Sequence, residues 1–406
     1  MSSPLASAGW AKTTLGGIFS ILSLLALAGC GNTFRPVAIP ITQNGGDPGG
    51  LRNAIIVSQN PAGAGSTLHI DVSGDTVASA HTVGIGPVQA VLAGGRTWVA
   101  NKSDGTLTGY TTFGGPGVSS NTATLPAGAC PVAMTSTETS ALYVADPGAG
   151  CAGGGTGNVD VINLIAADFT GQVPVGVNPV SIAELPNGSK IYVANQGDNS
   201  VTVINAVDHS IAATITTGIG NSPSFVVPSA DSACVYVANQ GDGTVSVIAT
   251  GNDAVAAGSP VTVGAGPSFL AFDAHAQRVY VANTAGNSVS VLSHVNTCTP
   301  TLIGTVAVGS APTSIAPLAD GTRVYVANSG SNNVSVINAS SVPNGTPKSI
   351  PVGSAPLSVA ASDDNSRVYV ANSGSGNVSI INTGNDTEIN RVATSSPTPV
   401  YVLVTP

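Results

Sequence analysis

Short alternations of apolar and polar residues recur along almost the whole chain. The segment RVYVANSGSNNVSVINA at residues 323–339 returns almost unchanged at 367–383 as RVYVANSGSGNVSIINT. Each apolar run is four to seven residues long, rich in Val and Ile, and bounded by Gly/Asn turns. Such runs are typical of short strands joined in hairpins. No stretch has a 3.6-residue period long enough for a helix, so the pattern predicts an all-β protein.

The copies follow one another at a nearly constant period. The residue after each Val-Ala pair, or its counterpart, marks that period, with steps of 43, 45, 49, 44, 44, 45 and 44 between Ser58, Asn101, Asp146, Asn195, Asn239, Asn283, Asn328 and Asn372. Every unit divides into four segments, and four strands at this spacing are the signature of a propeller blade. We therefore predict a β-propeller of four-stranded antiparallel blades, eight by this count, with seven as the alternative.

The two ends of the repeat complement each other. The chain finishes with TPVYVLVTP, which matches a first strand, whereas the first copy begins at a second strand. One blade is therefore expected to be shared, with its first strand at 399–404 and its other strands at 54–83. Such pairing of the N- and C-terminal strands closes the ring and leaves no open edge.

Composition restricts the surface and the partners. Of the 406 residues only 8% are charged, Gly occurs 50 times, and the formal net charge is −9. The few Lys and Arg are scattered, so the chain lacks the basic face that a duplex nucleic-acid binder needs. A surface of Ser, Thr, Asn and Gly suits an extracytoplasmic protein.

The N-terminus predicts export. Residues 1–29 contain no acid, and the apolar run at 18–28 is too short for a membrane-spanning helix but fits an export signal. The run ends in Leu-Ala-Gly before Cys30, which resembles the bacterial lipoprotein signal and implies that Cys30 carries the lipid. The alternative is ordinary secretion with Cys30 incidental. Residues 30–52 read as a Pro/Gly-rich tether, and 53–406 as one propeller domain.

The recurring YVAN followed by VSVIN resembles the YVTN family of bacterial propeller repeats, with Ala in place of Thr. The resemblance covers the exported domain and implies a propeller at the cell surface or in the periplasm. Members usually close with seven blades, and related propellers include lactonases of the 6-phosphogluconolactonase type. The repeat itself implies no chemistry.

Structural roles account for most of the repeated polar residues. The marker Asn is expected to end its strand in a left-handed turn and to bond its own backbone. The basic residues before the second strands are expected to form solvated pairs with turn acids, as between Arg323 and Asp320. Asp198 and Asp242 lie in Gly turns, where ordinary turn chemistry outweighs cation binding.

The cysteines are candidates for disulfides, since an exported protein is in an oxidising compartment. Cys130 and Cys151 fall on one face of one blade, and Cys234 and Cys298 on the opposite face of neighbouring blades; buried thiols are the other reading. The five histidines show no metal-ligand spacing, so neither a metal nor another cofactor is predicted.

One strand position breaks the repeat. The second residue after the opening Pro of each first strand is Gln89, Ala133, Ser181, Phe225, Phe269, Ser314, Ser358 or Tyr401. Its neighbour is nearly always aliphatic, and alternation puts the two on opposite faces. We expect the variable position to line the channel mouth, with Gln89, Phe225, Phe269 and Tyr401 as ligand contacts; variable core filling is the alternative.

Two functions remain open. The first is a membrane-anchored binding or scaffold module at the outer membrane or cell surface, monomeric, that recognises an envelope protein or a saccharide. A periplasmic or secreted protein is the alternative location. The second function is a lactonase-like hydrolase with its site at the channel mouth. The sequence favours binding without catalysis, because first strands supply few singular polar residues and no paired His.

Overall fold

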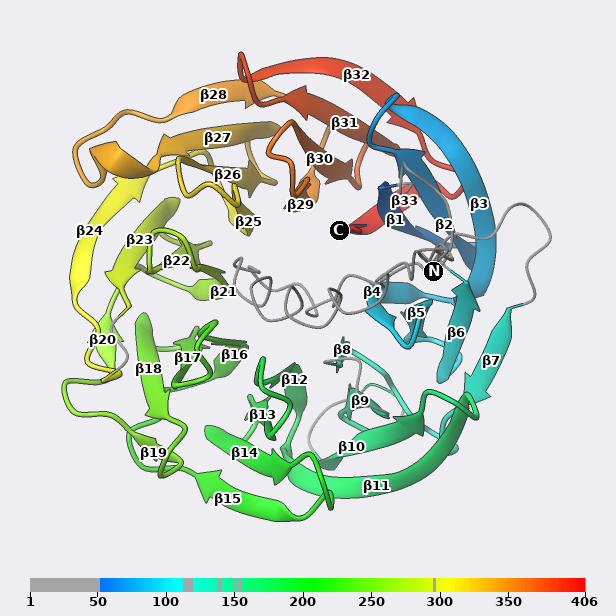
Figure 1. The fold of residues 1–406 in the computed structure, drawn as a ribbon, viewed down its shortest axis with the longest axis vertical. Coiled ribbons are helices and arrows are strands. Elements are labelled where there is room, and N and C mark those ends of the chain that lie inside the picture. Colours follow the sequence, from blue (N-terminus) through cyan, green and yellow to red (C-terminus); the bar gives the residue numbers. More distant parts are fainter. Residues whose placement is uncertain are drawn as a thin grey trace, which may run out of the picture. The chain divides into compact units, whose positions relative to one another are not determined.

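The alternating segments form strands, and the strands assemble into eight antiparallel sheets arranged in a ring (Figure 1). This computed structural model describes residues 52–111, 120–136, 141–148, 151, 155–294 and 297–405. The export segment, Cys30 and most of the predicted tether lie outside the described residues. The fold is the predicted β-propeller, and the seven-blade alternative is wrong. Within the described part of the chain, no helix has the length and apolarity needed to cross a membrane.

In every blade the strands follow one another from the channel outward. Blade 1 consists of β33 (Thr398–Val404), β1 (Asn53–Asn60), β2 (Gly63–Asp71) and β3 (Thr76–Ile85). Blade 2 consists of β4 (Pro87–Ala93), β5 (Arg96–Asn101), β6 (Thr106–Thr111) and β7 (Asn121–Thr124). Blade 3 consists of β8 (Ala133–Thr135), β9 (Ala141–Asp146), β10 (Thr156–Asn163) and β11 (Asp168–Val177). Blade 4 consists of β12 (Pro179–Glu184), β13 (Lys190–Asn195), β14 (Ser200–Asn205) and β15 (Ile211–Ile215).

The second half of the ring repeats this order. Blade 5 consists of β16 (Pro223–Pro228), β17 (Cys234–Asn239), β18 (Thr244–Ala249) and an outer strand divided into β19 (Ala254–Val255) and β20 (Val261–Thr262). Blade 6 consists of β21 (Pro267–Asp273), β22 (Arg278–Asn283), β23 (Ser288–Ser293) and β24 (Leu302–Ala307). Blade 7 consists of β25 (Pro312–Pro317), β26 (Arg323–Asn328), β27 (Asn333–Asn338) and β28 (Lys348–Pro351), with the short 3₁₀ helix Ala339–Ser341 before β28. Blade 8 consists of β29 (Pro356–Ala361), β30 (Arg367–Asn372), β31 (Asn377–Asn382) and β32 (Thr387–Ala393).

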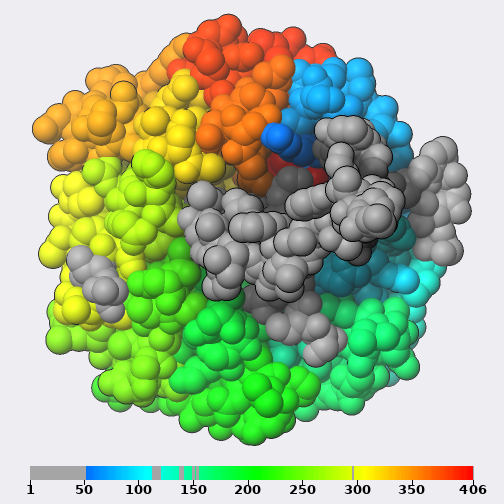
Figure 2. Space-filling view, viewed as in Figure 1, coloured from blue at the N-terminus to red at the C-terminus, as the bar shows by residue number. Residues whose placement is uncertain are grey.

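The ring closes within blade 1, as predicted. Strand β33 pairs antiparallel with β1, so that Ile56 lies opposite Val402 and Val57 opposite Tyr401. Beyond the strands, the N–H of Asn53 donates to the hydroxyl of Thr405 at 2.8 Å. Figure 2 shows the consequence: the red C-terminal part of the propeller lies beside its blue first strands. Closure therefore joins residues that are far apart in the sequence and completes blade 1.

The core lies between blades. The aliphatic position of the first strands is buried in every blade, as with Ile182, Val226 and Leu270, each 0% exposed. One apolar cluster joins Tyr192 of blade 4 to Val235 of blade 5, and equivalent clusters continue around the ring. Because both faces of each blade pack on a neighbour, the second strands are apolar on both sides.

The marker Asn has a different role from the one expected. In blade 4, Asn195 is the last residue of β13, is fully buried, and is absent from the described residues with positive φ. Its Nδ2 donates to the hydroxyls of Ser200 and Thr202 on β14, at 3.0 and 2.9 Å. The left-handed turn position is Asn199, with φ of 56°. The marker Asn thus joins the second strand to the third, and a different residue, Asn199, takes the left-handed conformation of the turn.

The basic residues at the start of the second strands also differ from expectation. Lys190 and Arg323 do not pair with acids of their own hairpin but reach the next blade, to Asp253 at 2.7 Å and Asp386 at 2.6 Å. Arg367 reaches Asp75 of blade 1 at 2.9 Å. These ion pairs are partly shielded from solvent, and they join neighbouring blades.

Candidate functional site

The inner strands of all eight blades surround a central cavity of about 260 Å³. The variable position of the first strands lines this cavity in every blade, because alternation turns it away from the aliphatic residue that packs between blades. The eight lining residues at this position are Gln89, Ala133, Ser181, Phe225, Phe269, Ser314, Ser358 and Tyr401. The structure therefore brings the four predicted contact residues together around one cavity.

These four residues form two pairs on opposite sides of the channel. Phe225 of β16 and Phe269 of β21 lie with ring centroids 4.6 Å apart. Tyr401 of β33 and Gln89 of β4 come from the neighbouring blades 1 and 2. Figure 1 shows β16 and β21 across the ring from β33 and β4. Between the two pairs the corresponding side chains are small, Ala133 and Ser181 on one side and Ser314 and Ser358 on the other.

The polar lining residues also accept hydrogen bonds from the backbone of the next blade, which the sequence did not predict. Ser181 Oγ accepts a hydrogen bond from the N–H of Val226 at 3.2 Å, and Gln89 Oε1 accepts from Met134 at 2.6 Å. Likewise, Ser314 Oγ accepts from the N–H of Val359, and Ser358 Oγ from the N–H of Val402. Among the described strands, none pairs with the free edge of an inner strand, so a side chain of one blade supplies an acceptor for the next. Phe225 and Phe269 carry no acceptor; their rings contact each other and pack against the apolar clusters of blades 5 to 7.

The cavity is uncharged. Its described lining contains hydroxyl, amide, aromatic and aliphatic groups, and no carboxylate, imidazole or amine. The described residues also contain no group of three His, Cys, Asp or Glu side chains that could hold a metal ion. Asp198 and Asp242 are engaged in their turns, where Asp198 accepts from Val177 N at 2.9 Å and Asp242 from Asn221 N at 2.8 Å.

Imidazole groups occur away from the channel. His69 contacts the hydroxyl of Tyr110 at 3.0 Å, and His81 stacks on the ring of Tyr110 at 4.3 Å. Burial, and to a smaller extent the charge of His81, lowers the pKa of His69 to about 3. This imidazole therefore stays neutral and acts as a hydrogen-bond partner in the seam between blades 1 and 2.

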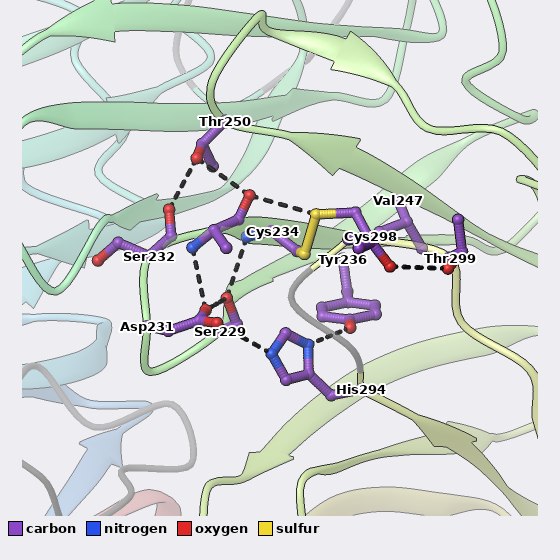
Figure 3. Close-up of a disulfide and its surroundings, with 12 residues drawn as sticks. Ser229, Asp231, Ser232, Cys234, Tyr236, Val247, Thr250, His294, Cys298 and Thr299 are labelled. Carbon is purple, nitrogen blue, oxygen red and sulfur yellow. Dashed lines mark hydrogen bonds and ion pairs between the residues drawn. A yellow bond between two sulfur atoms is a disulfide. The ribbon is translucent and has the colours of Figure 1, made fainter.

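The four described cysteines form two disulfides. Cys130 is bonded to Cys151 within blade 3, and Cys234 to Cys298 between blades 5 and 6. Figure 3 shows the second bond beside His294. The Nδ1 of His294 lies 2.7 Å from the hydroxyl of Tyr236, and its Nε2 lies 3.3 Å from Asp231 Oδ2. Cys234 occupies the position that Lys190 and Arg323 hold in other blades. The disulfide thus replaces an ion pair between blades.

Comparison with known proteins gives one family match, over part of the chain. The family described as "Lactonase, 7-bladed beta-propeller" matches residues 204–302, which is less than half of the chain. No curated protein sequence matches significantly.

Solved structures match over most of the chain. The periplasmic gluconolactonase PpgL of Pseudomonas aeruginosa has 17% identity and a TM-score of 0.59, covering 88% of this chain and 99% of its own. A putative 6-phosphogluconolactonase from Bacteroides fragilis has 16% identity and a TM-score of 0.58, covering 89% and 100%. Dihydro-heme d1 dehydrogenase NirN has 11% identity and a TM-score of 0.69, covering 93% and 80%. At these identities the likeness shows the fold alone.

Proposed function

We propose that this chain is a lipid-anchored binding protein of the cell envelope that holds a small uncharged ligand of the sugar or sugar-lactone class in its channel. The observation that carries the proposal is the cavity lining, with an aromatic pair facing a phenol and an amide. Aromatic faces cover the apolar surface of a ring, while hydroxyl and amide groups fix its orientation by hydrogen bonds.

Size and charge narrow the ligand class. Ligand sites usually enclose about 300–1,000 Å³, so a cavity of about 260 Å³ suits a single ring. An anionic sugar phosphate would enter without a cationic partner among the described lining residues, and burying an unpaired charge is costly. A neutral ligand is therefore favoured.

The location rests on three observations. The Leu-Ala-Gly-Cys30 sequence fits a lipidation site, the repeat resembles the YVTN family, and both disulfides suit an oxidising compartment. Together they support anchoring through Cys30 on the outer membrane or cell surface, with the propeller as a monomeric module that recognises a saccharide or an envelope protein.

Lactone hydrolysis is the second candidate. It is favoured by the family match at 204–302 and by the gluconolactonase among the similar folds. Hydrolysis needs an acid or base within hydrogen-bond reach of the reacting atoms, and the described cavity lining offers only Tyr401, hydroxyls and an amide. Binding therefore ranks first.

Calorimetric titration with neutral monosaccharides, gluconolactone and a sugar phosphate tests both candidates on one preparation. We expect a neutral compound to bind and Phe225→Ala/Phe269→Ala to weaken binding at least about tenfold, since each lost aromatic contact is worth about 0.5–1.5 kcal/mol beyond its area. Ile389→Ala, on the exposed outer strand β32, is the control and should bind as the wild type does.

The outcomes separate the candidates. Unchanged affinity in the double Phe variant would remove the channel site. Rapid lactone turnover that is lost in the same variant would replace binding by hydrolysis as the function.

A further inference from the structure

Blade 3 carries two acids where other blades carry an amide and a hydroxyl. In blade 4, the amide of Asn195 donates to Thr202, and Thr202 lies opposite Val193. In blade 3 the corresponding strand positions are Asp146 and Asp160, since Asp160 lies opposite Val144 and Asp146 ends β9. The amide donor that joins the second and third strands in six other blades is therefore missing here; those donors are Asn101, Asn195, Asn239, Asn283, Asn328 and Asn372.

Both acids are buried. Asp160 is 0% exposed and Asp146 2% exposed. Asp146 Oδ1 accepts from the N–H groups of Cys130 and Gly148, each at 2.7 Å. Asp160 Oδ1 accepts from Gln172 at 2.7 Å, while its Oδ2 is a buried atom without a hydrogen-bond partner among the described residues. Two adjacent carboxylates in such a site cannot both be ionised without a large cost, and one proton between them removes it.

The surroundings agree with a proton at Asp160. Burial, followed by the charge of Asp146 and opposed by the Gln172 hydrogen bond, raises the pKa of Asp160 to about 7. Strand β7 of blade 2, which contacts β11, has no titratable side chain. Of the other strands that contact blade 3, β12 carries the buried Glu184, and β13 carries Lys190 and Tyr192, both of which are bound to Asp253 of blade 5.

We propose that Asp146 and Asp160 hold one proton between them, carried by Asp160, and that losing it above neutral pH loosens the part of the channel wall that blade 3 supplies. Asp146 is connected to the channel wall through Cys130. It accepts a hydrogen bond from the N–H of Cys130, and Val132 and Ala133, which follow in the sequence, line the cavity. The bond from Cys130 to Cys151 joins the same point to the loop after β9.

The direction of the pH effect follows from linkage. The folded protein keeps a proton on Asp160 up to about pH 7, whereas an unfolded Asp releases it near pH 4. Stability therefore falls as pH rises from about 4 through the folded pKa, and this contribution is constant above it. This effect on stability does not depend on the proposed function.

The test compares the thermal midpoint of the full-length protein at pH 5 and pH 8. The variant Asp146→Asn/Asp160→Ser restores the pattern of the other blades. We expect the thermal midpoint of the wild type to fall by roughly 2–4 °C more than that of this variant between pH 5 and pH 8. Amide exchange, corrected for intrinsic rates, should show protection of the Cys130 N–H falling over the same range in the wild type alone. Asp242→Asn, which removes a turn acid, should follow the wild type.

Two results would overturn the proposal. One is a parallel pH profile for the wild type and the double variant. The other is stabilisation of the wild type at pH 8 by Ca²⁺, absent in the variant and reversed by a chelator, which would make the pair a cation site. If the double variant does not fold, Asp160→Ser alone removes the titrating group and gives the same comparison.

Discussion

The hydroxyl of Tyr192 donates a 2.6 Å hydrogen bond to Asp253, which lies 61 residues later on the outer loop of the next blade. Lys190 reaches the same carboxylate at 2.7 Å. One Asp thus holds a phenol and an ammonium of the preceding blade, and Asp386 repeats the arrangement with Tyr325 and Arg323. The packing between blades is largely apolar, and these polar contacts add a link between blades 4 and 5 and between blades 7 and 8.

Asp253→Asn should lower the free energy of unfolding by about 1–2 kcal/mol. It removes the charge that Lys190 pairs with in a partly shielded site. Asn is chosen because Asp253 has a φ of 50°, which Asn tolerates. Guanidinium unfolding measures the change. Glu388→Gln breaks a more exposed pair with Arg391 and should cost under about 0.5 kcal/mol; equal losses in the two variants would contradict a special role for the blade contact.

Two asparagines of blade 4, four positions apart, should lose different amounts of stability on substitution. Asn195→Ala removes a buried donor from Ser200 and Thr202 and should cost about 2–3 kcal/mol. Asn199→Gly should cost under about 1 kcal/mol, because Gly accepts the φ of 56° and only the bond to Ser222 N is lost. Denaturant unfolding of both variants tests this. The reverse order would restore the turn as the role of the marker residue.

The sequence predicted the architecture because period and alternation are local signals. Ring closure also followed, since the segment around Tyr401 matched a first strand and the first copy lacked one. The fate of polar side chains was harder to predict. Lys190 has acids near it in the chain, but its partner Asp253 is selected by the blade geometry.

For the candidate site, the sequence predicted only which position of each first strand faces the channel. Alternation identified the position occupied by Phe225 and Tyr401, and all eight such residues line the cavity. That Ser181 accepts from the backbone of Val226 required knowledge of the blade spacing. The acid pair Asp146 and Asp160 was hidden by the long loop between them, which separates two residues that other blades place seven positions apart.

The two disulfides should differ in their contribution to stability. Cys234 and Cys298 are 64 residues apart, and Cys130 and Cys151 only 21. In the loop-entropy account, the larger loop gives about 1 kcal/mol more stabilisation. Cys234→Ala/Cys298→Ala should therefore have a lower thermal midpoint than Cys130→Ala/Cys151→Ala. Equal midpoints would mean that bonding within blade 3 matters as much as bonding between blades.

If a lipid on Cys30 anchors the protein, removing Cys30 should move the protein from the membrane fraction to the soluble fraction. In the wild type, the protein should sediment with membranes and be released by detergent. Cys30→Ser should move it to the soluble fraction without changing its thermal midpoint, because the substitution lies outside the propeller. Mass spectrometry of the N-terminal peptide provides the direct readout: an unmodified Cys30 would end the lipoprotein proposal.

Closure of the ring predicts that the last strand is indispensable. Deleting residues 398–406 removes β33, which exposes the inner edge of β1 and the apolar surfaces of blades 8 and 2. In a closed propeller this loss extends to every blade, because each packs only on its two neighbours. The truncated chain should aggregate or lose its cooperative unfolding transition, as followed by circular dichroism. Deleting a segment of equal length from the predicted tether, 36–44, is the control and should leave the transition unchanged. A truncated protein that still unfolds cooperatively at the wild-type midpoint would show that the blades do not depend on closure.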